Sequence, residues 1–426
     1  MSKLTLTAFA AMTTLAFSNA AQAEKIAIIG GTVHTMTAQG SIEEATVLIE
    51  DGKISNIIPQ IVSTDESYRV IDAKGKVVTP GFIGAYTSLG LVEVSGWANT
   101  VDSSVAASAL HAALDATVAV NPDTTLRNIS RIEGITSAAT AVTYTDTMYK
   151  GRGAIITLAD DVDPVMKPRA FMTIDVSNHG ADVNGGSRAA LWVDLRNALN
   201  EAIYAQKITF TPQTEWHGSL SKANVQALIP VVKGEMPLLV QVHRASDIRR
   251  VIKITNNFKR LNITLVGAAE AWRVADEIAA AGMSVILNPE SNLPYSFEQN
   301  GATLENSARL HDAGVNVAIG MGTHNIRLAP QHAGNAVANG LPWQAGLASL
   351  TTAPAKIYGI DQQVGSLKAG MQADIVVWSG DPLEVMEAPT NVIINGVEVK
   401  LESRQTKLRD RYLTLDKAKP QQYTRP

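Results

Sequence analysis

The chain carries four short apolar runs between residues 240 and 319: Val240-Gln241-Val242, Ile263-Thr264-Leu265-Val266, Val285-Ile286-Leu287 and Val315-Asn316-Val317-Ala318-Ile319. Each run is rich in β-branched residues, which favour buried strands, and a spacer of helical length separates it from the next. This alternation is typical of parallel strand–helix units. Eight such units close a barrel, and the sequence alone distinguishes about six of them. The pattern therefore favours an α/β barrel.

Two of the helical spacers show their ends in the sequence. Ser187 is a suitable N-cap for one helix, and Gly282 ends a second helix that contains Val274 and Ile278. The first helix has an apolar face made of Leu191, Leu195, Leu199, Ala202 and Ile203.

The two ends of the chain change to a strand-and-turn pattern. Residues 26–29, 46–50 and 53–58 read as strands near the start, and residues 374–378 form a β run near the end. Asn395-Gly396 is a hairpin turn between two further short strands. Both termini are therefore expected to contribute to one sheet domain.

Composition narrows the class of function. The 426 residues include 36 Lys and Arg against 40 Asp and Glu, and neither sign gathers into a run, so we expect a small-molecule ligand and no nucleic acid. The chain has no cysteine, which excludes disulfides, thiolate metal ligands and a cysteine nucleophile. Any metal must be held by histidine, carboxylate or carbonyl groups.

The first 23 residues follow the pattern of an export signal. Lys3 precedes an apolar and small stretch, residues 4–17, and Ala21-Gln22-Ala23 has the form of a cleavage site. The alternative is a buried N-terminal helix, which the small residues at its end disfavour. No later stretch has transmembrane length, so we expect an exported protein without a membrane span, in the periplasm rather than outside the cell.

Three further stretches resemble the amidohydrolase superfamily, and most closely its imidazolonepropionase-like branch. They are Val77-Val78-Thr79-Pro80-Gly81-Phe82-Ile83, Gly365-Ser366-Leu367-Lys368-Ala369-Gly370-Met371-Gln372-Ala373-Asp374-Ile375-Val376-Val377-Trp378, and residues 335–342 with 351–355. Their order and separation match a family member over nearly the whole chain after the export signal. The resemblance implies an α/β fold, a (β/α)8 TIM-type barrel with a small β-sandwich domain built from both termini.

On this resemblance the chain divides into an export signal (1–23), a first β-sandwich segment (24–80), the barrel (81–360), a second β-sandwich segment (361–404) and a C-terminal tail (405–426). Family members hydrolyse C–N bonds of amides and cyclic amides with one or two divalent metals. The metal ionises a bound water, and a carboxylate carries the proton to the leaving group. The resemblance therefore implies a C–N hydrolase with a divalent metal such as zinc at the C-terminal ends of the strands.

The first barrel strand departs from the family's metal motif. That motif reads Pro-Gly-Phe-Ile-Asp-Ala-His-x-His, and its two imidazoles point to one side and chelate a metal. This chain has Gly84, Tyr86 and Ser88 in place of the Asp and the two His. A phenol with a free pKa of about 10 and a hydroxyl are poor zinc ligands. Tyr86 and Ser88 therefore either hydrogen-bond a ligand or fill the space of the lost imidazoles.

Two histidines stand near positions that the family uses. His243 follows residues 240–242 and matches the fifth-strand metal histidine, which makes it a candidate metal ligand and catalytic residue, with an ordinary hydrogen-bonded histidine as the alternative. His324 is the nearest substitute for the eighth-strand catalytic Asp, as a ligand, a base or a loop residue. A catalytic zinc takes about three protein ligands, so two imidazoles predict a zinc site that is weak or absent.

Arg244 and Arg327 follow strand ends, where a guanidinium can hold a substrate carboxylate or phosphate; the commoner alternative is a surface ion pair. Glu270 is expected to begin a helix, and Glu290 is a weak candidate for the barrel mouth. The fourth-strand metal ligand of the family has no identified counterpart. The remaining histidines are taken as structural: His34, His111, His179, His217, His311 and His332.

Two functions of different classes stand open at this point. The first is a metal-assisted hydrolase of C–N bonds, and the second is a catalytically inactive barrel that binds a small molecule or a partner. A third, metal-free catalysis by Ser88 or Tyr86 with His243 as base, lacks a group to orient the histidine. The sequence does not identify the substrate, and a homo-oligomer is compatible with it.

The export pattern predicts the N-terminus of the mature protein. Signal cleavage after Ala23 should leave Glu24 as the first residue, because small residues occupy both cleavage-site positions. Intact-mass measurement of the protein recovered from a periplasmic fraction checks this. Recovery of the whole chain from the cytoplasm, with residues 1–23 retained, would contradict the prediction.

Overall fold

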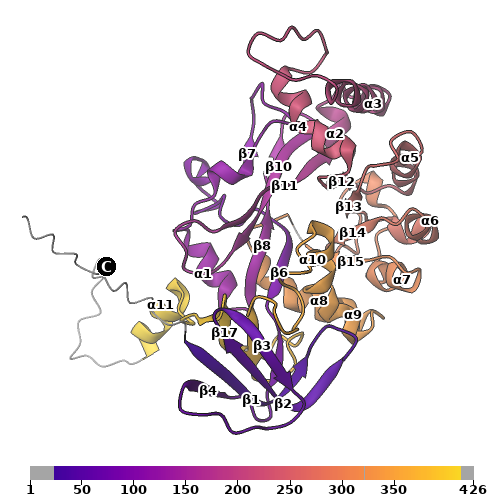
Figure 1. The fold of residues 1–426 in the computed structure, drawn as a ribbon. Helices are drawn as coiled ribbons and strands as arrows, with labels where there is room; N and C mark the ends of the chain where they lie inside the picture. Colours follow the sequence, from indigo (N-terminus) through magenta and orange to yellow (C-terminus); the bar gives the residue numbers. More distant parts are fainter. Residues whose placement is uncertain (1–23, 321, 414–426) are drawn as a thin grey trace, which may run out of the picture.

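The computed structural model describes residues 24–320 and 322–413, so the export signal predicted for residues 1–23 lies outside the described residues. Figure 1 shows a sheet domain at one end of the molecule, a strand-rich barrel beyond it, and helices α3 and α5 to α7 along one flank. The short helix α11 stands apart beside the sheet domain. No helix of the described part of the chain is long and apolar enough to cross a membrane.

Both ends of the chain build the sheet domain, as expected. Its strands are β1 (Lys25–His34), β2 (Ser41–Glu50), β3 (Lys53–Ile58), β4 (Tyr68–Asp72), β5 (Val77–Pro80), β16 (Ile375–Trp378), β17 (Pro389–Ile394) and β18 (Val397–Glu398). Hydrogen bonds join them in the order β18-β17-β16-β5-β1-β2-β3, with β4 beside β1. The expected sandwich is thus connected as one continuous sheet, because β5 pairs with β16 and bridges the two termini.

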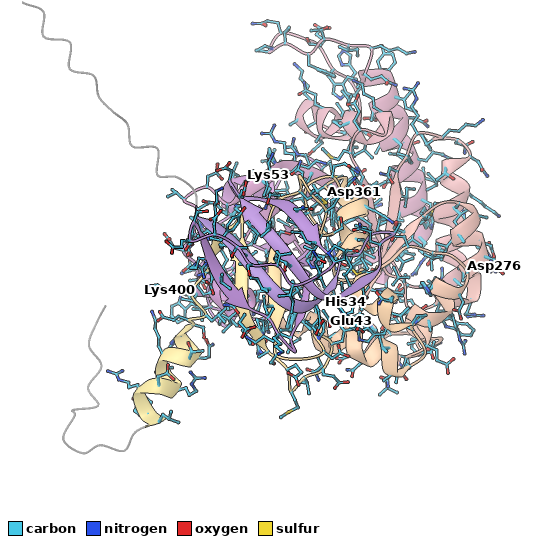
Figure 2. The ribbon with its side chains drawn as sticks, turned by 60° about the horizontal axis from the view of Figure 1, so that its bottom comes forward. His34, Glu43, Lys53, Asp276, Asp361 and Lys400 are labelled. Atoms are coloured by element: carbon cyan, nitrogen blue, oxygen red, sulfur yellow. The ribbon has the colours of Figure 1, made fainter. Side chains whose placement is uncertain are left out.

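The sheet domain meets the barrel through aromatic contacts. Trp378 ends β16, stacks on Phe82 with ring centroids 5.0 Å apart, and donates from its indole nitrogen to the Thr79 hydroxyl at 2.9 Å. At the C-terminal end of β1, the centre of the His34 ring lies 4.8 Å from the centre of the Trp343 ring on α9. Figure 2 turns this end of the molecule forward and shows His34 beside the sheet. Side-chain packing therefore fixes the sheet against the barrel.

Eight strands form the barrel sheet, in the order β15-β14-β13-β12-β11-β10-β8-β6. Their bounds are β6 (Phe82–Thr87), β8 (Ile135–Thr140), β10 (Tyr149–Thr157), β11 (Val165–Asp175), β12 (Leu238–Val242), β13 (Ile263–Gly267), β14 (Ser284–Leu287) and β15 (Val317–Ile319). Backbone bonds join the ends of the order, from Gly322 N to Tyr86 O at 2.9 Å and from Ser88 N to Thr323 O at 3.3 Å. The barrel is therefore nearly closed between β6 and β15.

The barrel departs from eight regular strand–helix units at β10. This strand runs antiparallel to both of its neighbours, β8 and β11. Only residues 158–164 separate β10 from β11. A parallel crossover needs about a dozen residues or more, whereas an antiparallel pair needs only a short turn, so the chain length here dictates the reversal.

Helices cover the outside of the barrel. They are α1 (Thr125–Arg131), α2 (Asn178–Asp182), α3 (Arg188–Ala205), α4 (Lys222–Lys233), α5 (Ala245–Thr255), α6 (Ala275–Ala280), α7 (Asn306–Asp312), α8 (Ala329–Ala338), α9 (Trp343–Ala348) and α10 (Thr352–Tyr358). The helix α11 (Arg404–Leu413) does not take part in this layer. The Ser187 hydroxyl accepts from Ala189 N and caps α3, which confirms the expected N-cap. Gly282, with φ of 65°, follows α6 as expected.

Short strands and 3-10 turns complete the connections: β7 (Ser104–Val105), β9 (Tyr144–Thr145), η1 (Ala98–Thr100), η2 (Ala116–Ala119), η3 (Ala271–Val274), η4 (Phe297–Gln299) and η5 (Ile326–Leu328). The strands β7 and β9 pair with each other beside the barrel, in a separate small sheet.

Replacing Trp378 by Ala should lower the free energy of unfolding by about 3–5 kcal/mol, because the buried indole packs between the sheet domain and the barrel. Urea unfolding followed by circular dichroism measures the loss. The matched control is Trp97→Ala, since this side chain is 64% exposed and should change stability by less than about 0.5 kcal/mol. Equal effects of the two substitutions would contradict the role assigned to Trp378.

Candidate functional site at the barrel mouth

A cavity of about 300 Å³ opens where the parallel barrel strands end. Strand ends on one side of a barrel are where the sites of such folds lie. A larger groove, of about 590 Å³, lies on the outer surface between α3 and α5. The mouth cavity is lined by Tyr86, Thr143, Gln241, His243, Val266, Gly267, Ala269, Asn288, Ser291, Gln299, Gly320 and Gly322.

Tyr86 occupies space that two glycines leave free. A Cβ on Gly320 would lie 2.9 Å from the Tyr86 backbone nitrogen, and one on Gly322 would lie 3.2 Å from the phenol ring. Burial raises the pKa of Tyr86 well above its usual value, and the Asp175 charge adds to this, while the neighbouring Thr173 hydroxyl opposes it. The phenol is therefore protonated at neutral pH.

A buried ion pair lies under the cavity. Lys150 on β10 and Asp175 at the end of β11 are 3.2 Å apart, with side chains only 3% and 0% exposed. Lys150 also donates to the Gln241 side chain, and Ser177 donates to Asp175 through its backbone nitrogen at 2.9 Å and its hydroxyl at 2.5 Å. Burial alone would raise the pKa of Asp175, but the Lys150 ammonium and the Ser177 hydrogen bonds hold it below its usual value. The Asp175 carboxyl group is therefore ionised at neutral pH.

His243 follows β12 and packs against Gly267. This glycine has φ of 83°, and a Cβ on it would lie 2.5 Å from His243 Cε1, so only glycine leaves room for the ring. Burial lowers the pKa of His243, the Asp175 charge partly opposes the shift and Lys150 adds to it. The imidazole is therefore neutral at pH 7, and its Nδ1 is buried without a hydrogen-bond partner among the described residues.

The other site residues expected from sequence lie elsewhere. Ser88 is buried beside the closure between β6 and β15 and does not line the cavity. Arg244 lies in the outer groove, where its guanidinium bonds Asp247 at 3.0 Å. His324 is partly buried in the loop after β15, and burial lowers its pKa, whereas Arg327 is exposed on η5. The structure brings Tyr86 and His243 to one cavity and leaves these four outside it.

Two glutamates near the mouth have structural partners. Glu270 accepts a hydrogen bond from Ala245 N at 3.0 Å. Its charge therefore stabilises the N-terminus of α5, and not only that of η3, the 3-10 turn that follows Glu270 in the chain. Glu290 lies 3.4 Å from the His332 imidazole and does not line the cavity. Neither glutamate is positioned to hold a ligand there.

Sequence reasoning missed Lys150, Asp175 and Gln241. Asp175 ends the apolar stretch of β11, the fourth strand of the barrel order, as His243 ends that of β12. A carboxylate directly after a strand was therefore a usable signal. The sequence around Lys150 gave no such signal, because the position of this lysine depends on the antiparallel course of β10.

The residues at this mouth do not fit a divalent metal. Members of the amidohydrolase family usually bind one, but no group of three or more His, Cys, Asp or Glu side chains that could hold an ion occurs within residues 24–320 and 322–413. The donors at hand are one imidazole and one carboxylate, and a lysine ammonium already pairs with that carboxylate. A metal would meet this cation at close range and lack ligands.

Residues 131–400 match the model of the amidohydrolase family. A stretch of 57 residues is 58% identical to the protein named Amidohydrolase tasK from Hapsidospora irregularis, covering 13% of this chain and 6% of that protein. A stretch of 60 residues is 40% identical to a 5'-deoxyadenosine deaminase from Methanosarcina mazei, covering 14% of this chain and 13% of that protein. The matched stretches thus span a small part of these relatives.

A crystal structure of an amidohydrolase from Thermotoga maritima superposes with a TM-score of 0.78 at 23% identity, over 88% of this chain and 99% of that chain. At this level of identity the likeness concerns the fold: a TIM-type barrel with a β domain.

Replacing Lys150 by Met should lower the free energy of unfolding by about 3–5 kcal/mol, because Asp175 would remain charged and buried without its partner. The double variant Lys150→Met/Asp175→Asn removes both charges and should recover most of that loss. The matched control is Arg249→Met, which breaks an exposed ion pair with Glu277 and should cost less than about 1 kcal/mol. Urea unfolding measures all three; failure of the double variant to recover stability would contradict the assignment.

Proposed function

Because this chain belongs to the amidohydrolase family, we propose that the cavity at its barrel mouth binds a small uncharged molecule with an amide or cyclic amide group. The observation that carries the proposal is the chemistry of the lining. Side-chain amides and hydroxyls surround the cavity, and its imidazole is neutral. Neutral donors and acceptors suit a secondary amide, which presents one carbonyl acceptor and one N–H donor, on the same side of the bond in a small cyclic amide.

The charges of the site support an uncharged ligand. Lys150 and Asp175 neutralise each other beneath the cavity, and the arginines expected to hold an acidic substrate lie outside it. A charged ligand would lose its hydration without gaining an opposite charge in the lining. A volume of about 300 Å³ matches a molecule of modest size, at the lower limit of ordinary ligand pockets.

We propose ligand binding without metal-assisted hydrolysis as the function that this geometry supports best. A bound metal would lower the pKa of its water toward neutrality, but the donor set at the mouth does not suit one. Hydrolysis of a C–N bond is the second candidate. The neutral, buried imidazole of His243 favours it, since a neutral histidine can accept a proton from water. Export to the periplasm stays part of the proposal, supported by the pattern of the first 23 residues.

A ligand panel with and without zinc separates the two candidates. Lactams, dipeptides and N-acyl amino acids are titrated calorimetrically into the dialysed protein, and product formation is followed by mass spectrometry. We expect saturable lactam binding without turnover and less than one equivalent of zinc. Gln299→Leu should weaken lactam binding about 5- to 20-fold through a lost hydrogen bond at the cavity wall. Gln363→Leu, exposed and outside the cavity, is the matched control and should leave it unchanged.

Turnover that a chelator abolishes, together with a full equivalent of zinc lost on His243→Ala, would establish the hydrolase and overturn the binding proposal. Absence of binding for every member of the panel would also overturn it.

A further inference from the structure

The outer groove between α3 and α5 has a chemistry opposite to that of the mouth. Its volume is about 590 Å³, within the range of small-molecule sites. Five of the described residues that line it are basic, and Asp247 is the acidic one among them. The basic lining residues are Arg188, Arg196, Arg244, Arg250 and Lys253. The whole chain has a net charge of −4, so a groove lined mainly by cations differs in sign from the protein as a whole.

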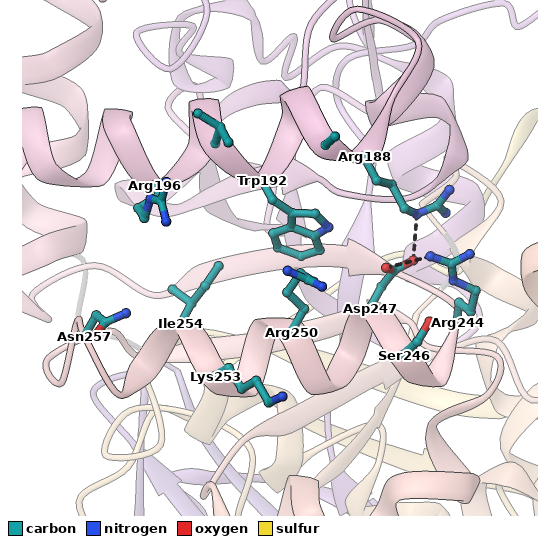
Figure 3. A pocket seen from close by; sticks show the side chains of 12 residues that line it. Arg188, Trp192, Arg196, Arg244, Ser246, Asp247, Arg250, Lys253, Ile254 and Asn257 are labelled. Atoms are coloured by element: carbon teal, nitrogen blue, oxygen red, sulfur yellow. Dashed lines mark hydrogen bonds and ion pairs between the residues drawn. The ribbon is translucent and has the colours of Figure 1, made fainter.

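One end of the groove is held rigidly. Asp247, only 3% exposed, accepts from Arg188 Nε at 2.8 Å on one oxygen and from Arg244 Nη2 at 3.0 Å on the other (Figure 3). Arg188 also donates to Glu298 at 3.0 Å. The Nε of Arg244 is buried and has no acceptor among the described residues. Two guanidiniums thus share one carboxylate, which fixes their positions and leaves donor capacity unused.

The rest of the groove holds cations without carboxylate partners. Arg196, Arg250 and Lys253 form no ion pair within the described ranges of the chain. The Arg250 guanidinium lies 6.0 Å from the centre of the Trp192 ring, and Figure 3 shows it pointing toward this indole from α5. Arg196 extends from α3 on the same side as Trp192.

Helical spacing explains why these side chains face one groove. Arg188, Trp192 and Arg196 are four residues apart on α3, and Arg250 and Lys253 are three apart on α5, so each set follows one face of its helix. On a single helix, basic residues with this spacing usually form a face that is exposed to solvent. Two basic faces directed into a shared groove repel each other instead, and a bound anion would relieve that repulsion.

We propose that this groove binds a small organic anion with two or more anionic groups. Phosphates and carboxylates share the relevant chemistry, closely spaced anionic oxygens that guanidinium groups hold through paired hydrogen bonds. Trp192 supplies a flat apolar wall for the carbon skeleton between the charged groups. His243 faces the mouth and Arg244 faces the groove, so consecutive residues after β12 serve two separate sites.

Calorimetric titration of the full mature chain tests the proposal, with tripolyphosphate as the phosphate probe and citrate as the carboxylate probe. We expect saturable one-to-one binding of at least one probe, weakened by raising sodium chloride from 50 to 200 mM, about the range over which exposed charges become screened. The double variant Arg196→Gln/Arg250→Gln should lose at least tenfold in affinity. Which probe binds more tightly assigns the natural ligand to phosphates or carboxylates.

The matched control is Arg249→Gln, which removes the same charge from α5 but pairs with Glu277 outside the groove, and it should bind like the unaltered protein. Lys253→Gln, which removes another cation that lines the groove, serves if the double variant fails to fold, and should lose about threefold or more. His243→Ala should leave anion binding unchanged, which keeps this test independent of the mouth cavity. Absence of saturable binding by both probes, or an equal loss with Arg249→Gln, overturns the proposal.

Discussion

The ion pair between Lys150 and Asp175 sets the character of the barrel mouth. Two charges buried this deeply are stable only together, since either one alone would carry a large desolvation cost. The charges also act on the neighbouring groups. The Asp175 charge adds to the rise that burial causes in the pKa of Tyr86, and it partly opposes the decrease that burial causes in the pKa of His243. Burial is the main cause of the protonated phenol and the neutral imidazole above the pair, and the two charges adjust both pKa values.

The floor of the cavity forms one packed unit. Tyr86 contacts Gly320 through its backbone and Gly322 through its ring, and a Cβ at either glycine would crowd it. Beneath it, the Lys150 ammonium lies 3.2 Å from the Asp175 carboxylate. Close packing and charge pairing thus hold the whole floor together.

Charge is divided between two sides of the same chain segment. The mouth offers neutral hydrogen-bonding groups, whereas the groove between α3 and α5 gathers basic ones, and the strand end at His243 and Arg244 borders both. Side chains of successive residues at a strand end point in opposite directions, so adjacent positions in sequence serve different surfaces. This is why Arg244, expected over the mouth, pairs with Asp247 outside it.

The sequence by itself determined the family, the barrel and the sheet domain shared by both termini, because local patterns and short motifs carry these features. It also placed His243 at a strand end. Only the tertiary structure decided the antiparallel course of β10, which brings Lys150 beside Asp175, and the packing of Tyr86 against Gly320 and Gly322. These contacts join residues far apart in the chain, and no local preference encodes which distant side chain fills a given space.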